Sequence, residues 1–175
     1  MIKKGDSVYV RSKGLISSMI AYVSSGGNKS PDIPSHEAKV LRVMGNTITL
    51  IEVVFKGRRE YDFNDYLRSG AKVWVKRDTY INDDNVHNML AHLQMVKIKG
   101  YDWKLITGFL LRFMFRKVFP KKWNFCWITK VLDSKVAFVC SEFCNSGRRA
   151  IGMDIKENET PYDNFRKIPS ENIDY

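Results

Sequence analysis

The sequence predicts an α+β fold in which a small antiparallel sheet packs against helices. Segments with the alternating pattern of strands come early in the chain and longer segments with helical spacing come later, an order typical of α+β proteins rather than of alternating βαβ units. With 175 residues, 44% of them hydrophobic, the chain can bury one core. We therefore expect a single domain over 1–175, with its core at about 5–150 and a C-terminal extension at 151–175.

The first strand is predicted in GDSVYVRS, where polar and apolar residues alternate. The next segment, LISSMIAYVSS, has the apolar spacing of a helix. Residues 24–34 contain two glycines and two prolines and are expected to form a loop. Three strands then follow in series, at residues 36–43, 48–55 and 71–76, with MGNT as a turn between the first two.

The middle of the chain changes from strand to helix spacing. Residues 83–98 begin with acidic residues and have one apolar face, which predicts an amphipathic helix. A second helical run extends from Asp102 to about Val118. Two short apolar runs follow, NFCWITKV and KVAFVC, and a further helix is expected to begin where the second run gives way to SEFCNS.

The net charge of +10 favours an anionic partner, namely nucleic acid, phospholipid head groups or an acidic polymer. Residues 97–122 supply most of it, with eight Lys and Arg against Asp102 alone. Large apolar residues alternate with the basic ones, and Gly108, Arg112 and Arg116 form one narrow polar stripe. This pattern favours a core helix. The alternative is an interfacial helix in which Arg112, Arg116 and Lys117 contact substrate or an anionic membrane.

The three cysteines, Cys126, Cys140 and Cys144, lie in the last third of the chain, which argues against a disulfide framework. They form no C-x-x-C pair, so we expect no structural zinc or other metal and no cofactor. No apolar leader with a cleavage site is present near the N-terminus, so cytoplasmic location is the default expectation, with association at a membrane surface as the alternative.

Three residues could together make a thiol active site. Cys140 stands where a β-branched run meets a predicted helix start, a position that favours the thiolate. Among the histidines, His36 opens a strand, where a side chain can face a cleft. Glu52 lies within the apolar segment TLIEVVF, where an unpaired charge would be costly. From these residues alone, a cysteine at such a position is usually a small buried core residue, as we expect of Cys126 and Cys144.

Five motifs occur in a particular order: GDSVYVRSKGLISSMI, SHEAKV, LIEVVF, GYDW and VCSEFC. Over roughly residues 5–147 this set resembles the circularly permuted papain-like amidases and peptidases of the NlpC superfamily, especially the YiiX-like branch. The resemblance implies a permuted papain-like cysteine hydrolase core. It also implies that Cys140 is the nucleophile, His36 the base and Glu52 the orienting carboxylate, and that Ser141 contributes a backbone N–H near the oxyanion.

The resemblance also suggests the chemistry, which is cleavage of an amide bond in a peptide or peptidoglycan-like substrate through an acyl-enzyme. A lipid-directed acyltransferase or thioesterase of the same permuted fold is one alternative, since amide and ester chemistry share a thioester intermediate. A basic nucleic-acid-binding module without catalysis is another, because the stretch at 97–122 could contact phosphates and stack on bases.

The triad makes a geometric prediction about the turn near Gly45 and Asn46. With a two-residue loop at these positions His36 would pair with Phe55, and Glu52 would lie on the opposite face of the sheet. An odd-length loop, or a bulge, would return Glu52 to the same face as His36. The triad therefore requires one of these two irregularities.

Overall fold

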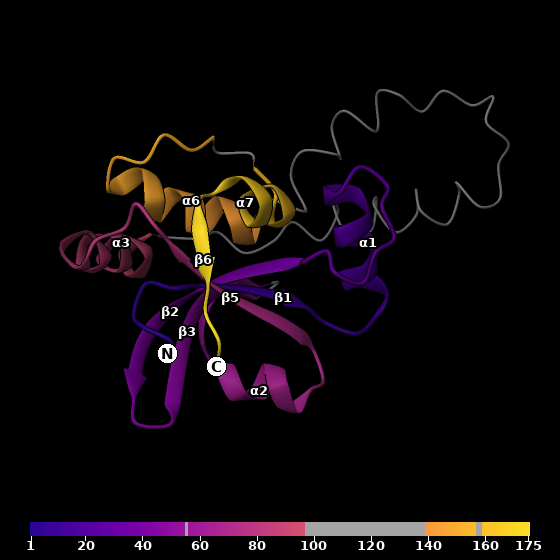
Figure 1. Cartoon of the computed structure of the whole chain (residues 1–175), viewed down its shortest axis with the longest axis horizontal. Coiled ribbons are helices and arrows are strands. Elements are labelled where there is room, and N and C mark those ends of the chain that lie inside the picture. Colours follow the sequence, from indigo (N-terminus) through magenta and orange to yellow (C-terminus); the bar gives the residue numbers. More distant parts are fainter. Residues whose placement is uncertain (55, 97–138, 157–158) are drawn as a thin grey trace, which may run out of the picture.

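A six-stranded antiparallel sheet with the strand order β4-β3-β2-β1-β5-β6 forms the centre of the protein (Figure 1). The computed structural model describes residues 1–54, 56–96, 139–156 and 159–175. The strands are β1 (Ser7–Arg11), β2 (His36–Met44), β3 (Thr47–Val54), β4 (Gly57–Asp62), β5 (Lys72–Asp78) and β6 (Ser170–Asn172). The described residues also form five helices: α1 (Leu15–Ser24), α2 (Phe63–Arg68), α3 (Asp83–Met95), α6 (Val139–Ala150) and α7 (Pro161–Lys167).

The predicted α+β class is confirmed, and most of the predicted elements are present in the described residues. Strands β1, β2, β3 and β5 and helices α1 and α3 lie within a few residues of their expected bounds, and α6 covers SEFCNS. Within residues 5–150, where the core was predicted, two elements were not predicted, namely strand β4 and helix α2. The charged sequence GRREYD forms β4 because an edge strand, paired only with β3, needs little apolar surface.

Helices cover both faces of the sheet, with α3, α6 and α7 on one side and α2 on the other (Figure 1). Because side chains alternate along a strand, neighbouring residues of β2 and β3 enter different cores. Ala38 and Leu50 pack with Phe63 and Tyr66 of α2. The second core joins residues of four elements, β2, β3, α3 and α6, namely Leu41, Ile51, Val53, Met89, Leu93, Phe143 and Cys144.

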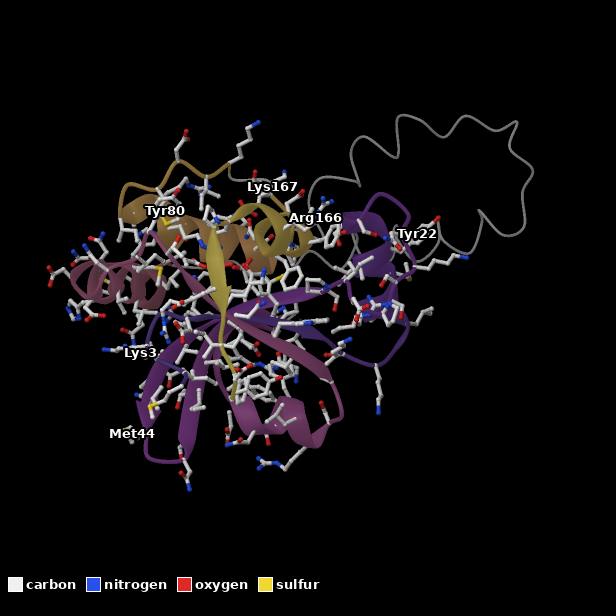
Figure 2. All side chains as sticks on the ribbon, in the orientation of Figure 1. Lys3, Tyr22, Met44, Tyr80, Arg166 and Lys167 are labelled. Carbon is white, nitrogen blue, oxygen red and sulfur yellow. The ribbon has the colours of Figure 1, made fainter. Side chains whose placement is uncertain are left out.

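The β2–β3 hairpin has a two-residue loop and a bulge. Met44 pairs with Thr47 across the loop, and Met44 projects from the hairpin tip (Figure 2). The register then shifts between Val40 and Arg42, so that Val40 pairs with Leu50. Lys39 pairs with Ile51, and continued by one residue this register sets Ala38 opposite Glu52. The irregularity that the triad requires is therefore present, as a bulge.

The segment from residue 151, predicted as a C-terminal extension outside the core, contributes to the sheet. Its strand β6 pairs with β5, and helix α7 begins with a capping box between Thr160 and Asp163. Phe165 of α7 packs edge-on against Tyr9 of β1, with ring centroids 5.3 Å apart. In the part of the chain that the structure describes, no helix has the length and hydrophobicity needed to cross a membrane.

Candidate active site

His36 and Glu52 are brought together by the hairpin. Atom Nε2 of His36 lies 2.8 Å from Oε2 of Glu52. Since an ionised carboxylate can only accept, Nε2 carries the proton of this hydrogen bond. The other ring nitrogen, Nδ1, is then free to face a second partner. The side chain of His36 is 17% exposed, so one edge of the site can be reached from solvent.

Glu52 is fully buried and has three donors around it. Arg59 Nε donates to Oε1 at 2.7 Å, and the Tyr66 hydroxyl donates to Oε2 at 2.6 Å. Burial opposes ionisation of this carboxylate, but the three donors, His36 above all, outweigh burial and lower its pKa to about 2. Glu52 is therefore a carboxylate at any ordinary pH.

Cys140 lies near the His36 ring, since its thiol contributes to the raised pKa of that ring. The residue stands in the first turn of α6 and is 5% exposed. Burial opposes protonation of His36, but Cys140 and Glu52 outweigh burial and raise the pKa of the ring to about 10. The arrangement thus favours an imidazolium beside Cys140 and the Glu52 carboxylate, the residue types that thiol catalysis combines.

The ring and the sulfur come from different layers of the molecule. Because side chains alternate along a strand, His36 lies on the same face of the sheet as Ala38, which is the face that α2 covers. Helix α6 lies on the other face. They can meet because His36 is the first residue of β2 and Cys140 stands at the beginning of its helix. The contact therefore forms at the end of the strand rather than through the sheet.

The other two predicted residues near the thiol differ in environment. Ser141 is fully buried in the first turn of α6. Cys144, one turn further on, is a core residue as expected, with no exposed surface. Burial, together with Glu37 nearby, raises the pKa of Cys144 well above the usual value, so this thiol stays protonated.

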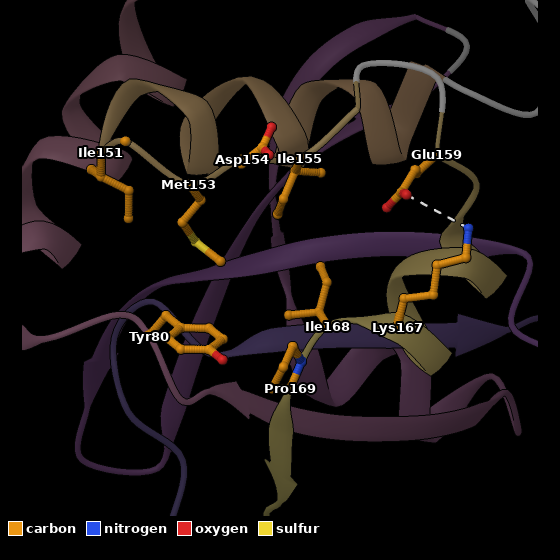
Figure 3. A pocket seen from close by; sticks show the side chains of 10 residues that line it. Tyr80, Ile151, Met153, Asp154, Ile155, Glu159, Lys167, Ile168 and Pro169 are labelled. Carbon is orange, nitrogen blue, oxygen red and sulfur yellow. Dashed lines mark ion pairs between the residues drawn. The ribbon is translucent and has the colours of Figure 1, made fainter.

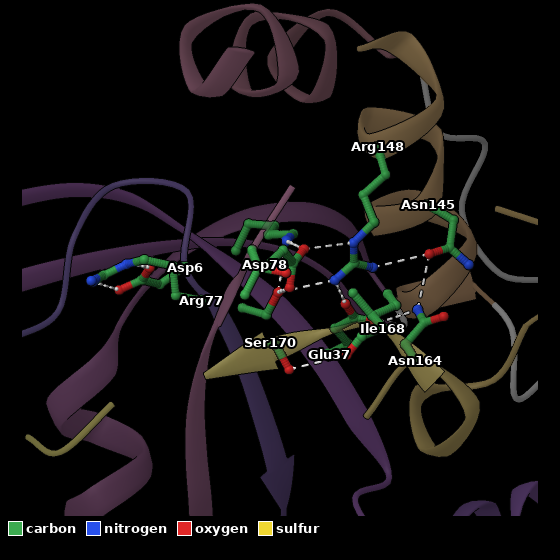
Figure 4. Close-up of polar contacts among 12 residues, drawn as sticks. Asp6, Glu37, Arg77, Asp78, Asn145, Arg148, Asn164, Ile168 and Ser170 are labelled. Carbon is green, nitrogen blue, oxygen red and sulfur yellow. Dashed lines mark hydrogen bonds and ion pairs between the residues drawn. The ribbon is translucent and has the colours of Figure 1, made fainter. Parts of the chain in front are cut away.

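A buried polar network ties α6 to the sheet (Figure 4). Its centre is the guanidinium of Arg148, which lies 2.7 Å from Glu37 and 2.9 Å from Asp78. Lys39 donates to the same oxygen of Asp78 at 2.8 Å. All four charged side chains are fully buried, and their charges balance. Further hydrogen bonds link this centre to Ser7, Asn145 and Asn164.

A hollow of about 480 Å³ lies at the other end of α6 (Figure 3). Its walls include Tyr80, Met153 and Ile168, with the ion pair between Lys167 and Glu159 at one side. It begins at Ile151, eleven residues after Cys140, a separation of about 16 Å along a helix. This hollow is therefore separate from the thiol site.

Several predicted features fall outside the described residues. The candidate contacts Arg112, Arg116 and Lys117, the rest of the basic stretch at 97–122, and Cys126 all lie there. Within the described residues, no group of three or more His, Cys, Asp or Glu side chains is placed to hold a metal ion.

The sequence had not indicated Arg59, Tyr66 or Arg148 as members of a site. Arg59 and Tyr66 belong to the two unpredicted elements, and Arg148 is one of two arginines at a helix end, where solvent exposure is the rule. The one available signal was Glu52 itself, since a buried carboxylate requires donors.

Comparison with known proteins adds no assignment. No model of a protein family matches the chain, and no curated protein matches it.

Proposed function

We propose that this protein is a cysteine hydrolase with Cys140 as nucleophile, His36 as base and Glu52 as the residue that orients the base. The observation that carries the proposal is the position of the His36 ring, which is hydrogen-bonded to the carboxylate of Glu52 and lies near the thiol of Cys140. A buried, non-catalytic cysteine needs no histidine beside it, and such a histidine needs no buried carboxylate to orient it. The ordered resemblance to permuted papain-like amidases agrees with the same three roles.

The chemistry follows from these contacts. His36 takes the proton of Cys140, and the thiolate adds to the carbonyl carbon of the substrate. Backbone N–H groups at the start of α6, including that of Ser141, stabilise the oxyanion. His36 then protonates the leaving amine as the C–N bond breaks, which leaves a thioester. A water molecule, deprotonated by His36, attacks the thioester, and the acid product and free thiol are released.

An amide bond in a peptide or peptidoglycan-like molecule is the proposed substrate class. A lipid ester substrate and a nucleic-acid-binding role both depend on the basic stretch at 97–122, which lies outside the described residues. The nucleic-acid alternative makes a different prediction. Retention on heparin that falls steeply with salt and survives Cys140→Ala would favour it over hydrolysis.

The test is acylation by p-nitrophenyl acetate, followed by intact mass measurement and peptide mapping. We expect one acetyl group on Cys140, none in Cys140→Ala, and slow acylation in His36→Ala. His87→Ala, which changes an exposed histidine on α3, is the matched control and should acylate at the wild-type rate. Acetylation that falls on Cys126 or Cys144 and spares Cys140 would contradict the proposal.

A further inference from the structure

The carboxylate of Glu52 is held from two further elements besides β2. On the sheet, Arg59 of β4 is the direct cross-strand partner of Glu52. Its guanidinium also stacks over the ring of Tyr61 at 4.1 Å, which restricts the long side chain. From α2, Tyr66 reaches the same carboxylate and packs edge-on against Tyr61 with ring centroids 5.0 Å apart.

These contacts divide the two carboxylate oxygens between different donors. Oε1 accepts from Arg59, whereas Oε2 accepts from both Tyr66 and the imidazole. Since each oxygen accepts hydrogen bonds from different donors, the carboxylate cannot rotate about its Cγ–Cδ bond without breaking a hydrogen bond. For the same reason the two oxygens cannot exchange places. The group is fully buried, so water cannot replace a lost donor easily.

We propose that Arg59 and Tyr66 are positioning residues, which together fix the Glu52 carboxylate in the orientation that aligns the ring of the base. The inference rests on the proposed function of that base. Without the hydrogen bonds from Arg59 and Tyr66, the carboxylate would no longer accept the Nε2 proton in line with the ring. The ring would then be shared between tautomers and orientations, and the thiolate–imidazolium pair would be less populated.

Both donors are suited to this role by their protonation. Burial and the nearby Glu52 raise the pKa of Tyr66, so its phenol stays protonated and donates at every working pH. Arg59 is always charged and is 43% exposed, so its removal should leave the core intact. Tyr66→Phe removes a single oxygen and keeps the ring that packs in the α2 core.

Two measurements test the proposal, and neither requires a substrate. The first is the rate of alkylation of Cys140 by iodoacetamide as a function of pH. The second is the tautomer of His36, from ¹⁵N chemical shifts of the ring in the Cys140→Ala background. The variants are Arg59→Met, Arg59→Lys and Tyr66→Phe. The controls are Arg68→Met, an exposed arginine on α2, and Tyr61→Phe.

We expect Arg59→Met and Tyr66→Phe to alkylate about tenfold more slowly at pH 7, the effect of one charge-assisted hydrogen bond, with the pH profile displaced to higher pH. The neutral ring should be purely Nε2-protonated in the wild-type site and mixed in these variants. Arg59→Lys should recover most of the rate, and the controls should match wild type. If Arg59→Met does not fold, Tyr66→Phe and Arg59→Lys decide the question.

Unchanged pH profiles and an unmixed tautomer in the folded variants would overturn the positioning role. A different result would overturn the proposed function itself, namely wild-type Cys140 alkylating no faster than an ordinary thiol. The tautomer measurement does not depend on that rate and would still decide whether Arg59 and Tyr66 hold the ring.

Discussion

His36 and Glu37, neighbours at the start of β2, bind the same helix from opposite faces of the sheet. His36 interacts with Cys140 at the beginning of α6, and Glu37 pairs with Arg148 two turns further along that helix. The two contacts fix where α6 lies along the strand and how it is rotated. The Cys140 thiol and the buried network are thereby parts of one arrangement.

Arg148→Met should be among the most destabilising substitutions in the protein. It leaves Glu37 and Asp78 buried with Lys39 as the remaining cation, and breaking a buried ion pair from one side costs about 3–5 kcal/mol. Urea unfolding would measure the loss. Arg166→Met, at an exposed arginine over the ring of Tyr162, is the control and should cost less than about 1 kcal/mol (Figure 2). Equal losses in the two variants would refute the structural role of the network.

His36→Ala should remove the pH-independent part of the thiol's reactivity. In the wild type the ring remains an imidazolium up to about pH 10, so alkylation of Cys140 should already be fast at pH 6–7. Without the ring, fast alkylation should require alkaline pH, as for an ordinary thiol with a pKa of about 8.5. Stopped-flow alkylation from pH 5 to 10 gives both profiles. Superimposable profiles would show that the histidine does not act on the thiol.

Glu52 should make the protein sensitive to acid. Its pKa is about 2 in the folded state against an ordinary 4.5, so its stabilising effect is complete above pH 4.5 and is lost as the pH falls toward 2. The wild-type free energy of unfolding should therefore fall more steeply than that of Glu52→Gln in this range, by up to about 1.4 kcal/mol per pH unit. Urea melts at several pH values give the two slopes. Asp78, whose pKa is also lowered, is common to both proteins and cancels in the difference. Parallel curves would contradict the prediction.

Gly147→Ala should destabilise the protein although alanine favours helices. A Cβ at this position would lie 2.9 Å from Leu93 Cγ and 3.0 Å from Met89 Cγ, where α3 packs on α6. Overpacking of this kind costs about 1–3 kcal/mol, more than the gain in helix propensity. Leu93→Ala would make room, so the double variant should be more stable than the sum of the two single effects predicts. Strict additivity in thermal or urea unfolding would mean that the two residues do not touch.

The sequence allowed the main strands, helix α3 and the residues of the thiol site to be named, because each had a local pattern. Whether Glu52 faces His36 could not be decided locally, since the two-residue loop alone places them on opposite faces. The answer depends on a bulge at Leu41, which leaves no trace in the pattern because Val40 and Leu41 are both apolar and both faces of the sheet are covered there.

The residues that hold Glu52 and anchor α6 could not be predicted from the sequence for a different reason. Arg59 and Tyr66 belong to a charged edge strand and a six-residue helix, which lack the length for a periodic signal. Arg148 is buried only because carboxylates from β2 and β5 lie across from it, and tertiary pairing of this kind leaves no mark on the neighbouring sequence.

The buried network has a consequence for the order in which the protein is made. Ser7 and Arg148, which share a hydrogen bond, are separated by 141 positions, and Asn164 closes the last contact to Glu37. A growing chain that has not yet reached residue 164 must leave that carboxylate incompletely satisfied, so the helix with the thiol cannot dock stably during most of synthesis. Cys140 thus reaches its place beside His36 only at the final stage of translation, when the sheet and its last helix come together.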